Sequence, residues 1–270
     1  MACIGRDGEL DELRTLWQRV LGGRAGMLLV SGEAGAGKTR LVREFARQVH
    51  RRGALVLHGR CDEDLAVPFR PFRECLAHYV LSVSEGRLAD HNQQWLASIT
   101  RLVPELARRT TQLPDPTRSD PDVERYLMFA AVAGLFREIA FTAPVVLVLD
   151  DLHWADPPTL QLVRHFAGAV LGRVMVLGTY RDGELVAGQP LHAALAALCR
   201  EPTFGNIRLE GLSESAVAAV IAAMVGGALD PTGLQLARDL ARATDGNAFL
   251  VVEEARHLRE TGTLIQVDNA

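Results

Sequence analysis

The sequence predicts an α/β fold with three layers, in which a parallel five-stranded sheet lies between two layers of helices and a helical part follows. Three observations support this prediction. Short apolar runs alternate with segments of helical periodicity over the first 211 residues. A glycine-rich segment joins the first apolar run to a helix. After Leu212 the periodicity is helical throughout. We therefore expect an α/β domain over residues 1–211 and a helical lid over residues 212–270.

The bulk composition is that of a globular protein. The chain has 270 residues, of which 48% are hydrophobic and 23% charged, and this balance argues against disorder. A net charge of −4 argues against a surface that coats nucleic acid. No apolar run approaches the roughly 20 residues of a membrane-spanning helix, and the N-terminus lacks the apolar core of a signal peptide. The four cysteines lie far apart, so we expect free thiols and a cytoplasmic location. From the charge and the short apolar runs we expect no direct contact with DNA or membrane.

A helix and a strand are expected before residue 32. The helix is marked by apolar residues at helical spacing, and the pair Gly22-Gly23 ends it. Its apolar positions are Leu10, Leu13, Trp17, Val20 and Leu21. The run over residues 27–31 is short and continuously apolar, as in a buried parallel strand.

The next segment has the pattern of a phosphate-binding loop. Residues 32–39 read G-E-A-G-A-G-K-T, which matches GxxxxGK[ST]. Glycines allow backbone N–H groups to approach phosphate oxygens, and the following helix adds its N-terminal dipole. Lys38 is the one lysine among 29 basic residues; we expect it to bind the β- and γ-phosphates and assist catalysis. The hydroxyl of Thr39 would bind Mg²⁺. The alternative is a glycine-rich turn with a solvated lysine.

We expect every residue of this segment to contact the nucleotide. The predicted binding residues are Gly32, Glu33, Ala34, Gly35, Ala36, Gly37, Lys38, Thr39 and Arg40.

A second strand is expected over residues 54–59, followed by a helical insertion over about 69–141. Three apolar stripes predict helices whose stripes face the core, and the proline-containing segment 110–121 between the second and third predicts a loop. The first stripe is Phe72, Leu76, Tyr79 and Val80, the second Trp95, Leu96, Ile99 and Leu102, and the third Tyr126, Leu127, Ala130 and Ile139.

The third strand, 145–149, ends in two acids. Ligand chemistry in an open parallel sheet lies at the carboxyl ends of the strands, so Asp150 and Asp151 should lie beside the phosphate loop. We expect Asp150 to coordinate Mg²⁺ through water and Asp151 to orient or deprotonate the attacking water. An acidic turn is the alternative. For His153 and Trp154, which follow, a packed loop is a simpler interpretation than catalysis.

The fourth strand, 174–178, leads into two further polar residues. Thr179 at this strand end could contact the γ-phosphate or the attacking water, and Arg181 could sense the charge of the γ-phosphate. An arginine pointing into solvent is the alternative for Arg181. A fifth strand is expected over residues 206–210.

The lid should contain three helices. Ser213 can cap the first, and Pro231 suits the first turn of the second. Asn247 can cap the third, with Phe249 and Leu250 buried.

Together these segments resemble the STAND branch of P-loop ATPases. More narrowly, they resemble the ATPase module of large bacterial transcriptional regulators, both the MalT-like regulators with LuxR-type DNA-binding ends and the SARP family. Similar modules occur in some multidomain adenylate cyclases and serine/threonine kinases. The matching stretches cover nearly the whole chain, and the L-D-D-L-H-W-A-D block is the most specific. They are residues 4–7, 32–40, 59–61, 149–156, 178–181 and 245–250.

The resemblance implies a P-loop NTPase fold with strand order 5-1-4-3-2. It implies ATP or ADP with Mg²⁺ as cofactors, Gly5 and Arg6 near the adenine, and a lid that closes over the nucleotide. This chain departs from the family in two places. Residues 246–249 read G-N-A-F where the family usually has G-N-P-F, and residues 209–212 lack a proline that relatives often carry. These departures concern the contacts to the base.

The function that the resemblance implies is a regulatory switch that binds ATP and hydrolyses it slowly. Effector and DNA-binding domains would belong to further parts of a larger protein, and nucleotide-dependent self-association is possible. The alternatives are the ATPase module of an adenylate cyclase or kinase, a high-turnover motor, and a degenerate nucleotide-binding scaffold. The presence of Lys38, Thr39, Asp150 and Asp151 argues against the scaffold.

Overall fold

The five predicted strands form one parallel sheet. The computed structural model describes residues 3–63, 67–110, 113–115, 120–169, 171–186 and 188–261. The strands are β1 (Gly26–Gly32), β2 (Leu55–Arg60), β3 (Val145–Asp150), β4 (Val174–Thr179) and β5 (Phe204–Leu209). Their order across the sheet is β2-β3-β4-β1-β5, which confirms the predicted order read from the opposite edge. This order places the carboxyl end of β4 beside that of β1, and the carboxyl end of β3 one strand further along the same edge.

The predicted strand bounds agree with the structure to within one residue for the first four strands. The fifth begins at Phe204 instead of residue 206, because Phe204 is already in register with Met27 of β1. Pairing with a neighbouring strand decides this boundary.

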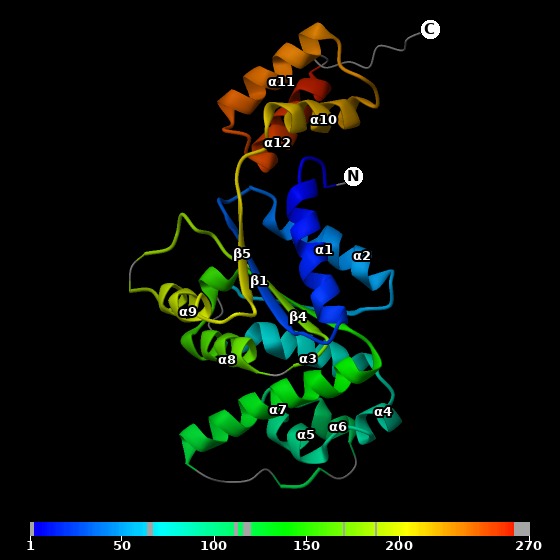
Figure 1. Cartoon of the computed structure of the whole chain (residues 1–270), viewed down its shortest axis with the longest axis vertical. Coiled ribbons are helices and arrows are strands. Elements are labelled where there is room, and N and C mark those ends of the chain that lie inside the picture. Colours follow the sequence, from blue (N-terminus) through cyan, green and yellow to red (C-terminus); the bar gives the residue numbers. More distant parts are fainter. Residues whose placement is uncertain are drawn as a thin grey trace.

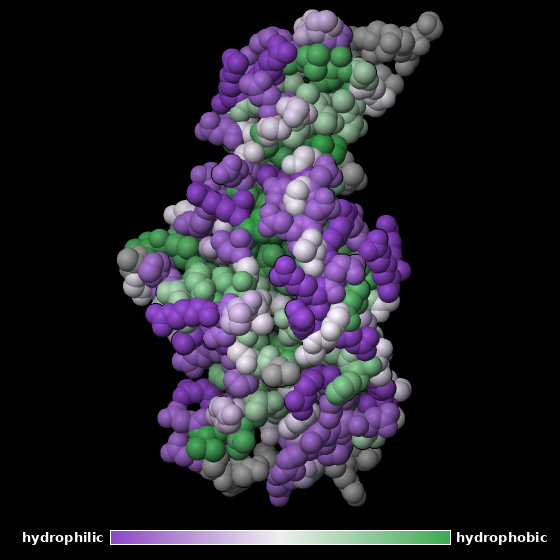
Figure 2. All heavy atoms as spheres, viewed as in Figure 1, coloured by the Kyte–Doolittle hydropathy of each residue, from purple (hydrophilic) through white to green (hydrophobic). Residues whose placement is uncertain are grey.

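Helices cover both faces of the sheet (Figure 1). On one face lie α1 (Asp7–Leu21) and α2 (Lys38–His50). The other is covered by α3 (Arg70–Ser82), α7 (Pro121–Thr142), α8 (Pro157–Gly168) and α9 (Pro190–Leu198). Because side chains alternate along a strand, Leu28 joins the core under α1 and α2, while Leu29 joins the core on the other face. Over α1 and α2 the visible surface is mainly hydrophilic (Figure 2), as expected for helices that bury one face.

The helical insertion contains α4 (Glu85–Ala89), α5 (Gln93–Ile99) and α6 (Leu106–Arg109) between α3 and α7. The first two predicted stripes lie in the core or pack against it. For the third stripe, the prediction that its first two residues face the core is wrong, since Tyr126 is 62% exposed and Leu127 is 38% exposed. The buried stripe of α7 begins one turn later, at Phe129. Tyr126 lies before this buried stripe and makes a T-shaped contact with the ring of His165. Leu127 lies on a different face of the helix from the stripe.

The predicted loop at residues 110–121 is non-helical at 110, 113–115 and 120, but its last residue, Pro121, already begins α7. Residues 111–112 and 116–119 of that prediction lie outside the described residues. Within the described ranges, none of the helices has both the length and the hydropathy that crossing a bilayer requires.

The C-terminal helices pack around a cluster of their own. They are α10 (Glu214–Val225), α11 (Pro231–Ala243) and α12 (Ala248–Glu260). Their cluster includes Val217, Ile221, Ala237 and Val251. The predicted caps are present: Ser213 Oγ accepts the N–H of Ala216, and Pro231 occupies the first turn of α11. Residues 262–270 of the predicted lid lie outside the described residues.

The prediction that Phe249 and Leu250 are buried is wrong. These side chains are 59% and 45% exposed. The first turn of α12 lies against the phosphate loop rather than inside the helical cluster, and the buried face of α12 begins at Val251 and continues at Ala255.

Candidate nucleotide-binding site

The predicted phosphate loop curls around the ammonium of Lys38. Gly35 and Gly37 have φ angles of +82° and +99°, a region that residues with a Cβ rarely adopt. This backbone brings the carbonyl oxygens of Gly32 and Glu33 to 2.8 Å from Lys38 Nζ. Lys38 is the first residue of α2 and is 8% exposed. The loop thus holds a positive charge at a helix N-terminus, which favours an anionic ligand.

The charge around Lys38 also favours an anion. Burial lowers the pKa of Lys38, and the positive charge of Arg181 lowers it further, against the opposing effect of Asp151. A bound phosphate would stabilise both cations by opposite charge.

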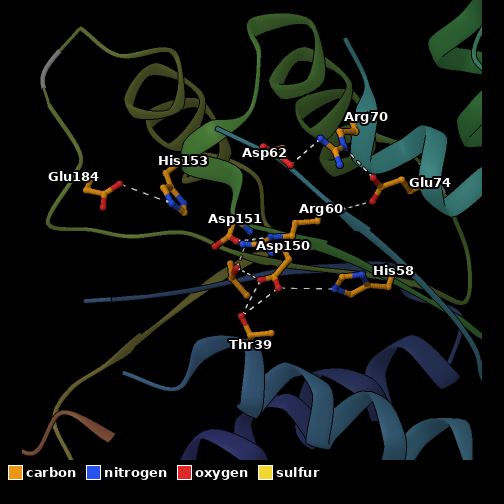
Figure 3. Close-up of polar contacts among 11 residues, drawn as sticks. Thr39, His58, Arg60, Asp62, Arg70, Glu74, Asp150, Asp151, His153 and Glu184 are labelled. Atoms are coloured by element: carbon orange, nitrogen blue, oxygen red, sulfur yellow. Dashed lines mark hydrogen bonds and ion pairs between the residues drawn. The ribbon is translucent and has the colours of Figure 1, made fainter. Parts of the chain in front are cut away.

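Asp150 lies at the end of β3 among hydroxyl groups (Figure 3). Its side chain is buried, and Thr39 Oγ1 lies 3.2 and 3.1 Å from its two oxygens. The hydroxyl of Thr179 donates to Oδ1, and His58 Nε2 lies 3.8 Å from Oδ2. Burial raises the pKa of Asp150, but the nearby His58 and the hydrogen bonds from Thr179 and Thr39 outweigh it, and the pKa lies below its usual value. An ionised carboxylate beside a threonine hydroxyl fits Mg²⁺, which prefers hard oxygen ligands.

Asp151 points elsewhere because its backbone is left-handed, with φ +58°. Its Oδ2 accepts a hydrogen bond from Arg60 Nε at 2.8 Å, and its N–H donates to Thr179 Oγ1 at 2.9 Å. Thr179 is fully buried. The hydroxyl of Thr179 thus contacts both acids in this structure, and its predicted contact with the γ-phosphate or the attacking water stays a prediction.

A cavity of about 420 Å³ lies over the loop. At its phosphate end it is lined by residues 34–40 together with Arg60, Asp151 and Arg181. Its other end is apolar, with Cys3, Ile4, Leu212, Val220 and Val252 as lining residues.

Arg60 and the apolar lining residues were missed by sequence reasoning. Arg60 could have been found, because it ends β2 and strand ends carry the chemistry of such a sheet. The apolar residues gave no local signal, since they come from three distant segments of the chain.

Arg6 joins the N-terminal segment to two other parts of the site. It is 6% exposed, and its guanidinium donates to the carbonyl oxygens of Ala36 at 3.2 Å and Glu210 at 2.6 Å. The preceding residue, Gly5, packs closely against Ala216 of α10, because a Cβ at Gly5 would lie 2.4 Å from the Cβ of Ala216. Arg6 lines the cavity, whereas the predicted contact of Gly5 and Arg6 with adenine stays a prediction.

The N-terminus of α12 touches the phosphate loop. Asn247 caps the helix with its Oδ1, and its Nδ2 donates to the carbonyl of Ala34 at 2.8 Å. The N–H of Phe249 donates to the carbonyl of Gly35 at 3.0 Å. Lid and loop are therefore hydrogen-bonded to each other directly.

Comparison with known proteins identifies related sequences. The family model described as "AAA ATPase domain" matches residues 2–177. An uncharacterized protein of Rhizobium meliloti is 25% identical over 218 residues, 74% of this chain and 21% of that protein. The hybrid signal transduction histidine kinase G of Dictyostelium discoideum is 28% identical over 172 residues, 59% of this chain and 5% of that protein. The chain thus spans a small part of the length of these relatives.

Solved structures share the fold at low sequence identity. A single-substitution variant of RuvB from Thermotoga maritima has a TM-score of 0.53 at 13% identity over 98% of this chain and 66% of its own. The Drosophila ORC structure bound to DNA gives 0.51 at 14% identity, over 98% and 59%. A STAND protein with a tetratricopeptide repeat sensor from Pyrococcus horikoshii gives 0.50 at 13% identity, over 95% and 33%.

Proposed function

The chain belongs to the AAA ATPase domain family, and from that premise we propose that it is a regulatory module that binds ATP with Mg²⁺ and hydrolyses it slowly. One observation carries the proposal: the phosphate loop, Asp151 and Arg181 line one cavity, Asp150 contacts Thr39 of the loop, and the lid helix α12 is hydrogen-bonded to the loop. A change at the phosphates can therefore act on the lid directly.

The roles of the residues follow from their positions. The loop N–H groups and Lys38 bind the β- and γ-phosphates. Thr39 and Asp150 hold Mg²⁺, which would neutralise phosphate charge. Asp151 orients the attacking water once it is free of Arg60, with which it is paired at 2.8 Å in this structure. That pairing keeps the base occupied and is consistent with low turnover.

We place the module in a larger signalling protein of the cytoplasm. The relatives run much longer than this chain, and the STAND structure has a sensor. A bacterial transcriptional regulator of the MalT-like, LuxR-type or SARP kind is the host we favour, with effector and DNA-binding domains as partners and self-association in the ATP state. Within the chain, residues 1–211 form the nucleotide-binding part, with its helical insertion at about 69–141, and residues 212–270 the lid.

One alternative host has specific support. The match to a histidine kinase of Dictyostelium favours the module of a multidomain kinase. The output then differs, but the nucleotide chemistry of this chain stays the same.

Calorimetry with ADP and a non-hydrolysable ATP analogue, with and without Mg²⁺, tests the binding, and phosphate release in excess ATP tests the turnover. We expect saturable binding of both nucleotides, tighter for the ATP analogue with Mg²⁺, and turnover well below the roughly 10 s⁻¹ typical of enzymes. Hydrogen exchange over residues 212–261 should differ between the two nucleotide states. Equal lid protection in both states would contradict the switch, and absence of nucleotide binding would contradict the whole proposal.

A further inference from the structure

The side chain of His153 is buried close to Asp151. It lies in η1 (Leu152–Trp154), and its side chain is 4% exposed. Among the residues that the structure describes, neither Nδ1 nor Nε2 has a hydrogen-bond partner. Its ring packs on Trp154 at a centroid distance of 4.9 Å. Buried polar groups are nearly always paired, so an unpaired histidine two residues from Asp151 points to a partner that it gains in another state.

One carboxylate faces this ring. Glu184 Oε2 lies 3.8 Å from His153 Nε2, just beyond hydrogen-bond distance, and the two side chains point toward each other (Figure 3). The other oxygen of Glu184, Oε1, accepts a hydrogen bond from Arg181 at 2.7 Å. Glu184 is therefore hydrogen-bonded to Arg181 and lies just outside hydrogen-bond distance of His153.

Arg181 has a competing use. It lines the same cavity as the phosphate loop. Burial is the main cause of the lowered pKa of Lys38, and the positive charge of Arg181 is the second. While Arg181 is paired with Glu184, one of its donors is occupied. A γ-phosphate would compete for that donor, whereas ADP lacks the group that could do so.

We propose that His153 and Glu184 are positioning residues that set the preference of the site for ATP over ADP, an inference that rests on the proposed nucleotide switch. Without a γ-phosphate, Glu184 holds Arg181. With ATP bound, Arg181 turns to the γ-phosphate, and Glu184 accepts the Nε2–H of His153. Burial lowers the pKa of His153, so the ring is neutral and donates in its Nε2–H tautomer without any proton transfer.

This exchange of partners by Glu184, from Arg181 to His153, determines which nucleotide state is favoured. The ion pair is 35% and 42% exposed, and such pairs are weak, so breaking it is a small obstacle. The contact with buried His153 forms only in the ATP state and offsets that loss. A contact made in one state alone shifts the equilibrium toward that state.

His153→Phe tests this, because phenylalanine fills a similar space without a donor. We expect the ATP analogue to bind about three- to tenfold more weakly by calorimetry, with ADP affinity unchanged. His153→Gln, which keeps an N–H donor, should recover most of the loss. His165→Phe is the matched control, because His165 is also partly buried with a lowered pKa but lies against Tyr126 and Phe129, away from the cavity; it should change neither affinity.

A suppressor variant tests the exchange itself. In the His153→Phe background, Glu184→Gln removes the competitor for Arg181 and should restore two- to fivefold of the lost ATP affinity. Asp11→Asn breaks another Arg–carboxylate pair with the same three-residue separation and a 2.7 Å contact, to Arg14 on α1. It should restore nothing.

Spectroscopy of the unmutated chain gives an independent readout. In ¹⁵N-histidine-labelled protein, the Nε2–H signal of His153 should be protected with the ATP analogue and unprotected with ADP. Glu184→Ala, which removes the acceptor, should abolish the protection.

Three results would overturn the inference: equal losses for both nucleotides in His153→Phe, no suppression by Glu184→Gln, or the same His153 signal in both nucleotide states. The switch itself is judged separately by Arg181→Ala. If that variant weakens the binding of ATP alone while the variants at Glu184 and His153 have no effect, only the proposed exchange of partners by Glu184 is wrong. If it weakens ATP and ADP equally, the proposed sensor fails as well.

Discussion

The two ends of the nucleotide cavity are built in different ways. The phosphate end uses consecutive residues 34–40, and its side chains are hydrogen-bonded to neighbouring backbone and to Asp150. The lid end is apolar, and its residues come from the N-terminus, from Leu212 before α10, and from α10 and α12. A few polar contacts join the two ends, namely those of Asn247, the Phe249 N–H and Arg6.

This difference suggests a division of labour. The phosphate end is preorganised and would supply chemistry and most of the affinity. The lid end depends on how α10–α12 pack, so it would report the nucleotide state more than it creates affinity. Substitutions at the two ends should therefore differ in kind as well as in size.

The largest expected effect lies at the phosphate end and concerns rate. Asp151→Asn should lower kcat by about 100-fold or more, because an amide cannot accept the proton of the attacking water. Nucleotide affinity should stay within about twofold. Asp150→Asn is the matched variant one residue away, and it should weaken the Mg²⁺-dependent part of binding instead. Phosphate release at saturating ATP measures the first effect; wild-type turnover in Asp151→Asn would refute the assignment.

Lys38→Ala should weaken ATP binding by about 100-fold, since it removes the buried charge that we propose binds the β- and γ-phosphates. Lys38→Arg should also impair binding, because the guanidinium is planar and bulkier. Arg43→Ala, an exposed cation on the same helix, is the control and should bind normally. Titration with a fluorescent ATP analogue measures the effect, and unchanged affinity in Lys38→Ala would remove the basis for the phosphate site.

Arg181→Ala connects the two ends. Loss of one charge-assisted contact costs about 1.5–3 kcal/mol, or roughly tenfold to a hundredfold in ATP affinity, with ADP nearly unchanged. Hydrogen exchange over residues 212–261 should then show a lid less protected with the ATP analogue than in the wild type. If both nucleotides lose affinity equally, Arg181 is structural.

The smallest effect is expected where the lid meets the loop. Asn247→Ala removes both the cap of α12 and the bond to the Ala34 carbonyl. Loss of a cap typically costs about 1 kcal/mol, so we expect about fivefold weaker binding of ATP and ADP alike. Ser213→Ala removes the cap of α10, which has no such bond to the loop, and serves as the control by calorimetry. A loss confined to ATP would contradict the division between the two ends.

Local patterns in the sequence were sufficient for much of the fold and for the phosphate end. The glycines and Lys38 act on neighbours within a few residues, so their pattern specifies the loop. The two acids follow a buried strand, and their place at the sheet edge follows from parallel topology. The strand order itself came from the family resemblance rather than from periodicity.

Other features could not be predicted, because they depend on segments far apart in the chain. Apolar spacing placed Phe249 in a helix, but the contact of α12 with Gly35 decided that its side chain is exposed. The position of Thr179 at a strand end was predicted, but packing of β3 beside β4 directed its hydroxyl to the acids rather than to the cavity.

The sequence by itself determined the glycine-rich loop at a helix N-terminus that we propose binds phosphate, because backbone conformation and helix dipole are properties of short segments. Only the tertiary structure decided how the remaining charges are paired, as in Arg60 with Asp151 and Arg181 with Glu184. Side-chain partners depend on distances between strand ends and loops, and these distances are set once the sheet and both helix layers have packed. For the same reason, the absence of a hydrogen-bond partner for His153 among the described residues became visible only in the folded chain.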